Sequence, residues 1–156
     1  MFHLNCIKFD YTSYKKAWGV DLISSEIEEI DELLGSNPLL NETLILQNSA
    51  LAVKDIRRMA YSCILGDVEK VLGWPKNIFF EEGVSFYVSN IPEADFNGLG
   101  TITKLINEYV MNLTDEQTKM FRAIFDYQML RKDGTISRIC QESIVLKRDS
   151  KGNILF

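Results

Sequence analysis

Histidine and cysteine are scarce in this sequence, and their scarcity argues against two kinds of site. The chain has one histidine, His3, and three cysteines, Cys6, Cys63 and Cys140. These residues offer no spacing from which a tetrahedral metal site is built, so we predict no metal. An odd number of widely spaced cysteines also argues against a disulfide framework. Reduced thiols, and hence a cytoplasmic location, are the expectation.

Long apolar runs and excess positive charge are missing as well. The apolar runs are too short to cross a bilayer, and the opening MFHLNCIKFDY lacks the continuous apolar core of a secretory signal. The 17 Lys and Arg residues face 22 Asp and Glu residues, which gives a formal net charge of −5. Proteins that bind nucleic acid usually present a basic stripe. We therefore expect neither a membrane span nor direct contact with nucleic acid.

The remaining composition is that of an ordinary soluble domain. Hydrophobic residues make up 46% of the chain and charged residues 25%. A chain of 156 residues fits one domain, and such a domain buries about two-thirds of its unfolded surface.

The clearest pattern is a pair of hairpins in the stretch Lys119–Phe156. Apolar and polar residues alternate over 121–129, as in a half-buried strand. Lys132-Asp133-Gly134 supplies a turn, because glycine takes positive φ without steric cost. Residues 136–146 are again rich in β-branched side chains, and Ser150-Lys151-Gly152-Asn153 makes a second turn before a third strand. The pattern predicts an antiparallel meander with one buried face.

Two registers of the first hairpin remain open. If Lys132–Gly134 is a three-residue loop, Tyr127 lies opposite Ile139. If Asp133-Gly134 is a two-residue turn, Tyr127 lies opposite Cys140, because a slip of one residue exchanges the faces of the second strand. We favour the first register, since it keeps the β-branched residue with the aromatic ones.

Upstream of the meander, the sequence predicts a helical extension and then an α+β domain. Residues 1–48 form the extension, which contains a helix over 24–34 and packs on the domain or on a second copy. Apolar runs at 44–54 and 59–65 predict a hairpin, and helical segments follow at 68–72, 78–88 and 99–113. The last helix is expected to bury one apolar face, made of Ile102, Leu105, Ile106, Tyr109 and Val110. Residues 49–156 thus predict a five-stranded antiparallel sheet with helices on one face.

This order of elements resembles a PAS domain over residues 51–156. Three motifs carry the resemblance: DVEKVLGWP (67–75), IPEADF (91–96) and DYQMLRKDGTISRICQESIVLKRDSKGNIL (126–155). With the residues before it, the chain is similar to the N-terminal sensory half of bacterial LuxR-type helix-turn-helix regulators. It departs from the PAS pattern at Ile91, where many PAS domains have histidine, and its last strand is barely begun at Phe156. We therefore expect a fragment of a longer regulator.

The resemblance implies a sensory and dimerisation domain that signals to a C-terminal DNA-binding domain. The alternative is the input domain of a histidine kinase or of another signalling enzyme. Haem-binding PAS domains usually ligate iron from the long helix, and residues 99–113 contain no His or Cys. Photoactive flavin domains need a Cys just before that helix, and residues 96–100 have none. We predict no cofactor and no catalytic activity, because no base is expected near a Ser or Cys nucleophile.

The favoured register also nominates a ligand pocket. Six residues share the helix-covered side of the first hairpin: Phe121, Phe125, Tyr127, Ile139, Gln141 and Ser143. Gln141 and Ser143 are polar groups in apolar surroundings and must find hydrogen-bond partners. Those partners are either a small-molecule ligand or other groups of a structural network.

A homodimer is the other expectation. The outer face of the meander carries Ile124, Leu130, Cys140 and Ile144. An apolar outer face otherwise stays in contact with water. This face and the N-terminal segment are the candidate dimer surfaces.

Overall fold

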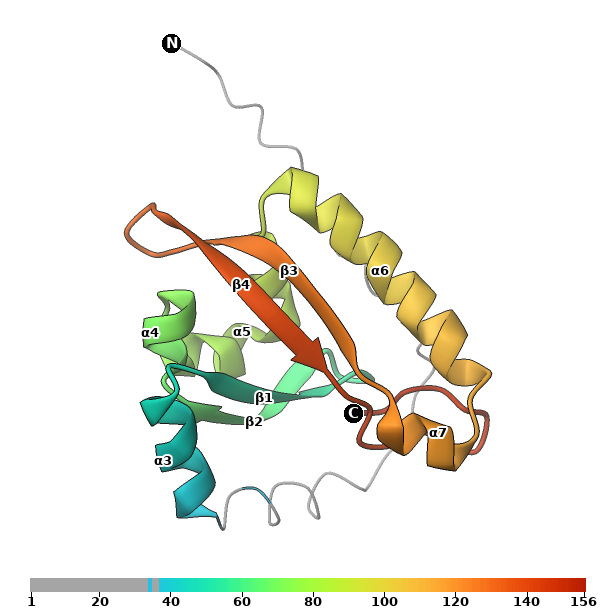
Figure 1. Ribbon diagram of the computed structural model, residues 1–156. Helices are drawn as coiled ribbons and strands as arrows, with labels where there is room; N and C mark the ends of the chain where they lie inside the picture. Colours follow the sequence, from blue (N-terminus) through green and yellow to red (C-terminus); the bar gives the residue numbers. More distant parts are fainter. Residues whose placement is uncertain (1–33, 35–36) are drawn as a thin grey trace.

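The computed structural model describes Leu34 and residues 37–156, whose helices and strands are shown in Figure 1. They are α3 (Pro38–Leu46), β1 (Ala50–Asp55), β2 (Ala60–Gly66), α4 (Val68–Leu72), α5 (Lys76–Ser89), α6 (Glu93–Met111), α7 (Asp115–Met120), β3 (Ala123–Leu130) and β4 (Ile136–Ser143). The helix predicted over 24–34 lies outside the described residues, Leu34 excepted.

The strands form two separate pairs, so the predicted PAS-like five-stranded sheet is wrong. β1 pairs with β2 and β3 pairs with β4, both antiparallel. Where a fifth strand was expected, Arg148 and Ile154 form an isolated bridge. Leu155 N–H donates to the carbonyl of Lys147 at 2.9 Å, and Leu155 accepts from Ile56 N–H at 3.0 Å. These bonds lie just beyond the ends of β4 and β1, and they do not build the continuous ladder that joins strands into one sheet. The broader α+β class is confirmed.

The β3–β4 hairpin has the register that the sequence favours. Tyr127 pairs with Ile139, and Arg131 N–H donates to the carbonyl of Thr135 at 2.8 Å. Gly134 has a φ of 82°, a conformation that favours glycine. The Asp133 carboxylate accepts bonds from the hydroxyl and N–H of Thr135, and these bonds lower the pKa of Asp133. The three-residue loop is therefore confirmed, and it fixes which side chains face inward.

The first predicted strand begins later than expected because its opening residues end α3. Pro38 stands in the first turn of this helix, where its missing N–H costs little. The side chain of Asn37 caps it by accepting from Leu40 N–H at 3.1 Å. A short apolar run such as 44–46 does not by itself distinguish a helix from a strand. β1 starts only at Ala50, after Asn48 reverses the chain with a φ of 51°.

The main core lies among the β3–β4 hairpin, β2, α4, α5 and the start of α6. Its buried members are Met59, Ile64, Val68, Leu72, Phe79, Val84, Val88, Ile91, Leu99, Tyr127 and Met129. Edge-to-face rings connect the layers, since Tyr87 meets Tyr127 and Tyr61 meets Phe79, each at 6.2 Å between centroids. Trp74 Nε1 also donates to the carbonyl of Leu130 at 2.8 Å. These contacts hold the hairpin against α4 and α5 (Figure 1).

A second cluster closes the far end of α6. Ile56, Val110 and Ile154 are buried there, and we call this group the end cluster. Its partly buried members are Ile106, Leu113, Phe121 and Val145. The end cluster gathers residues from α6, from the link between α7 and β3 and from the segment after β4, so it fixes their spacing.

Candidate functional site

The predicted pocket residues divide between the two clusters. Phe125, Tyr127 and Ile139 pack in or against the main core, and Tyr127 is only 3% exposed. Phe121, the C-cap of α7, packs instead against the end cluster. Gln141 and Ser143 lie opposite Phe125 and Ala123, on the inner face of the hairpin. The structure thus spreads the predicted residues along this face.

A chain of hydrogen bonds runs along the inner face of the hairpin. The Tyr127 hydroxyl donates to Gln141 Oε1 at 2.8 Å, and Gln141 Nε2 donates to Ser143 Oγ at 2.8 Å. Both ends of the Gln141 amide therefore have partners within the protein. Ser143 accepts from Gln141, and its own hydroxyl proton meets no acceptor in the described part of the chain. The chain of bonds satisfies Gln141 and ends at one free donor.

The buried face of α6 shares Val110 with the predicted one but is partly polar. Its buried residues are Leu99, Thr103, Asn107 and Val110. Thr103 is 3% exposed and Asn107 is 8% exposed, whereas Leu105 and Tyr109 of the predicted face are 58% and 59% exposed. Thr103 and Asn107 were missed because polar residues are normally assigned to the solvent side. Steps of four residues, from Leu99 to Thr103 and from Thr103 to Asn107, were the available signal.

Asn107 stands out because its side-chain oxygen is buried without a hydrogen bond. No described residue donates to Asn107 Oδ1. Leaving a buried acceptor unpaired costs about 1–3 kcal/mol, so such atoms are rare in folded proteins. The oxygen is therefore poised to accept a bond from a small molecule or a water.

The polar residues of α6 and of β4 each fall, along their own element, between residues of the two clusters. On α6, Thr103 and Asn107 fall between Leu99 of the main core and Val110 of the end cluster. On the hairpin, Gln141 and Ser143 follow Ile139, which packs on the main core, and precede Val145, which packs on the end cluster. α6 runs alongside β3 (Figure 1), and we group the two sets by their position along α6 and β4. We define the polar layer as Thr103, Asn107, Gln141 and Ser143.

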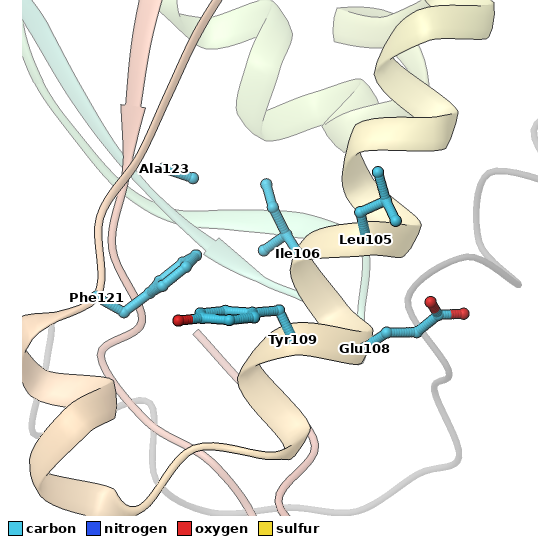
Figure 2. Close-up of a pocket in the computed structure, with 6 residues that line it drawn as sticks. All are labelled: Leu105, Ile106, Glu108, Tyr109, Phe121 and Ala123. Carbon is cyan, nitrogen blue, oxygen red and sulfur yellow. The ribbon is translucent and has the colours of Figure 1, made fainter.

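An open apolar groove lies between α6 and β3, and Figure 2 shows it. Its volume is about 530 Å³, and its lining residues are Leu105, Ile106, Glu108, Tyr109, Phe121 and Ala123. The rings of Tyr109 and Phe121 lie 5.9 Å apart and close one end. The Glu108 carboxylate points away from Phe121 at the rim (Figure 2). The groove offers mainly contact area for apolar side chains.

The outer face of the hairpin is apolar and exposed. Its large apolar residues are Ile124, Leu130, Ile136, Ile144 and Leu146, all at least 41% exposed. Two ion pairs, Arg122–Glu142 and Arg138–Asp126, are interleaved with them. Each pair neutralises itself, so this face carries no net charge although the chain does.

Comparisons of the chain with protein-family models, curated proteins and solved structures give no match, so the resemblance to PAS domains rests on the motifs alone. Among residues 37–156, no group of three His, Cys, Asp or Glu side chains could hold a metal ion. None of the described helices is both long and apolar enough to traverse a bilayer.

Proposed function

We propose that the chain is the ligand-sensing and dimerisation domain of a bacterial LuxR-type regulator, which passes its signal to a DNA-binding domain. The observation that carries the proposal is the unpaired Asn107 Oδ1 in the polar layer. A binding pocket typically combines apolar walls with a few placed polar groups, and the polar layer sits between two apolar clusters. The PAS-like motifs support a sensory role.

The polar layer defines what kind of ligand it selects. Asn107 Oδ1 can accept a hydrogen bond from a donor group of the ligand. The Ser143 hydroxyl can donate a hydrogen bond to an acceptor group of the ligand. A small molecule with an N–H or O–H group, a nearby acceptor and an otherwise apolar body satisfies both. A ligand that lacks the donor leaves Asn107 unpaired, which makes the layer selective.

A thermal-shift screen of small metabolites against the full chain tests the sensory role. We expect hits to raise the melting temperature of the wild type and to lose this effect in Asn107→Leu, which keeps the side-chain size but removes the acceptor. Gln141→Ala should also weaken the effect, because it breaks the bonds to Tyr127 and Ser143. Asn97→Leu, an exposed position on α6, is the matched control. Equal shifts in the Asn107 and Asn97 variants would argue against the site.

Dimerisation is assigned to the outer face of the hairpin. Apolar patches of this kind mark interaction surfaces, and a face without net charge adds no repulsion between two copies. Sedimentation equilibrium of the wild type should show a dimer, and the double variant Ile136→Lys, Ile144→Lys should be monomeric. Leu46→Lys on α3, where Leu46 is 82% exposed, controls for added charge. A wild type that stays monomeric at high concentration contradicts this assignment.

Ligand binding then acts by shifting an equilibrium between two arrangements of the dimer. A ligand achieves this only if it binds one arrangement more tightly than the other. Bound hits should therefore change the dimer dissociation constant of the wild type, and they should not change that of Asn107→Leu.

A further inference from the structure

Strand β3 has one paired edge and one edge that is partly open. Arg131 and Thr135 form a hydrogen-bonded pair, and such pairs alternate along an antiparallel ladder. The N–H and C=O groups of Ile124, Asp126 and every second residue after them therefore point away from β4. This edge faces α6 (Figure 1).

The upper part of this edge is already closed. Leu130 N–H donates to the carbonyl of Asn90 at 2.8 Å, and Gln128 N–H donates to Asp95 Oδ2 at 2.6 Å. Lower down, no described residue bonds to the outward backbone groups of Ile124 or Asp126. The open stretch thus offers two N–H donors with their flanking carbonyls, which is a template for another strand.

The apolar groove lies beside this open stretch. Ala123 and Phe121 supply the wall next to β3, and Ile106 and Tyr109 supply the wall on α6 (Figure 2). An open strand edge beside apolar pockets is the arrangement used for strand addition. Main-chain bonds then hold the incoming segment, and alternate side chains enter the pockets.

We propose that this groove binds an extended segment of a partner protein, which adds to β3 as a strand at Ile124 and Asp126. The open backbone groups require an extended segment, because a helix has already used its own. The apolar lining requires apolar side chains at alternate positions. Glu108 at the rim and the net charge of −5 favour basic rather than acidic residues between them. The groove lining shares no residue with the polar layer or the outer face, whereas Ile124 gives its backbone to the open edge and its side chain to the outer face.

The direct test uses a short fluorescein-labelled peptide in which Val and Ile alternate with Lys and Thr. Fluorescence anisotropy with the full chain should show binding, and amide exchange should slow at Ile124 and Asp126. The same peptide with its strand-facing nitrogens methylated is the matched probe, because methylation removes those N–H donors and keeps every side chain. We expect it to bind about tenfold more weakly.

Two pairs of variants locate the site. Ile124→Pro removes an outward N–H on β3 at the groove. Glu142, which pairs with Ile124, lies on β4, and Glu142→Pro removes an outward N–H on the other edge of the hairpin. Leu105→Glu places a charge in the groove without changing the backbone. Leu46→Glu, which places the same charge on α3 outside the groove, is its control. Ile124→Pro and Leu105→Glu should each weaken peptide binding about tenfold, whereas both controls should retain it.

Three results would overturn the proposal. One is equal peptide affinity in the Ile124→Pro and Glu142→Pro variants, and another is no binding at millimolar peptide. The third is a wild-type dimer that Ile124→Pro dissociates and Ile136→Lys, Ile144→Lys leaves intact. Such a result would mean that a second copy of the chain, paired through its own β3 edge, occupies the groove.

Discussion

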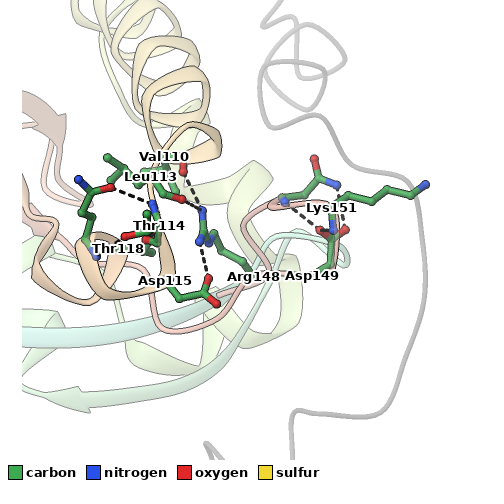
Figure 3. Close-up of polar contacts among 10 residues, drawn as sticks. Val110, Leu113, Thr114, Asp115, Thr118, Arg148, Asp149 and Lys151 are labelled. Carbon is green, nitrogen blue, oxygen red and sulfur yellow. Dashed lines mark hydrogen bonds and ion pairs between the residues drawn. The ribbon is translucent and has the colours of Figure 1, made fainter.

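Arg148 Nη1 donates a hydrogen bond to the carbonyl oxygen of Val110 at 2.9 Å, although 38 residues separate them in sequence. The same nitrogen donates to the carbonyl of Leu113 at 3.0 Å, and Nη2 reaches Asp115 (Figure 3). The last carbonyls of a helix lack partners within it and carry partial negative charge. Arg148 therefore satisfies the end of α6 and anchors the segment after β4 to it.

Arg148→Ala should lower the free energy of unfolding by about 2 kcal/mol. The guanidinium side chain is 10% exposed, and its loss removes the bond to the Leu113 carbonyl, while the Val110 carbonyl keeps the bond from Leu113 N–H at 3.1 Å. Arg148→Lys should recover only part of this, because an ammonium cannot reproduce the fork of the guanidinium. Urea denaturation measures the difference. Arg138→Ala, whose ion pair is 68% exposed on the arginine side, should change stability by less than about 1 kcal/mol. Equal effects at both arginines would contradict the anchoring role.

Gly83→Ala should destabilise the chain by about 3 kcal/mol. Gly83 interrupts α5 with φ 65° and ψ −152°, and an added Cβ would stand 2.8 Å from the carbonyl oxygen of Met59. That carbonyl also accepts from Val84 N–H at 3.0 Å, so neither side moves freely. Gly98→Ala is the control, because a Cβ there meets nothing within 4 Å and alanine favours the helix. Thermal unfolding should show Gly98→Ala more stable than wild type by about 0.5–1 kcal/mol.

Tyr127→Phe should cost about 1–2 kcal/mol of stability. The substitution removes the donor to Gln141 Oε1 and leaves that oxygen half-buried without its partner. A double-mutant cycle with Gln141→Leu should give a coupling energy of about 1 kcal/mol, since the two side chains share one bond. Tyr109→Phe, at 59% exposure, should be neutral. A coupling near zero would mean that the hydrogen-bonded chain does not contribute to stability.

The hairpin could be predicted from sequence because its determinants are local. The alternating pattern around Phe125 and Tyr127 and the turn at Gly134 predicted the two strands. The expected burial of Ile139 predicted their register. The arrangement of the two strand pairs depends instead on contacts between distant segments. Single bonds such as Ile56 N–H to Leu155 leave no periodic trace in the sequence. The prediction of a five-stranded sheet was wrong because it assumed that the two strand pairs join into one sheet.

The candidate site was predicted only from the hairpin side. Gln141 and Ser143 were recognised because the register placed them inward among apolar residues. Thr103 and Asn107 break the apolar pattern of α6, so the predicted face turned toward Leu105, which is exposed. A helix that buries polar side chains defeats periodicity, and such violations concentrate at functional sites.

Lys54 should make stability depend on pH above neutrality. Burial lowers the pKa of this lysine from 10.5 to about 7 in the folded chain. Between these values the unfolded chain binds the proton and the folded chain does not. The free energy of unfolding therefore rises with pH across this window, by at most about 1.4 kcal/mol per pH unit. Below pH 7 both states carry the charge, and the slope disappears.

Lys54→Met isolates this contribution, because it keeps an unbranched side chain without the titrating group. Urea denaturation from pH 6 to 10 should give a flatter profile for the variant and a higher stability at neutral pH. Lys76→Met, at an exposed position in the first turn of α5, should leave the wild-type slope unchanged. Parallel profiles for the wild type and Lys54→Met would show that the amino group stays hydrated in the folded chain. A hydrated amino group would have the same pKa in the folded and unfolded chains, and the pH slope would be absent.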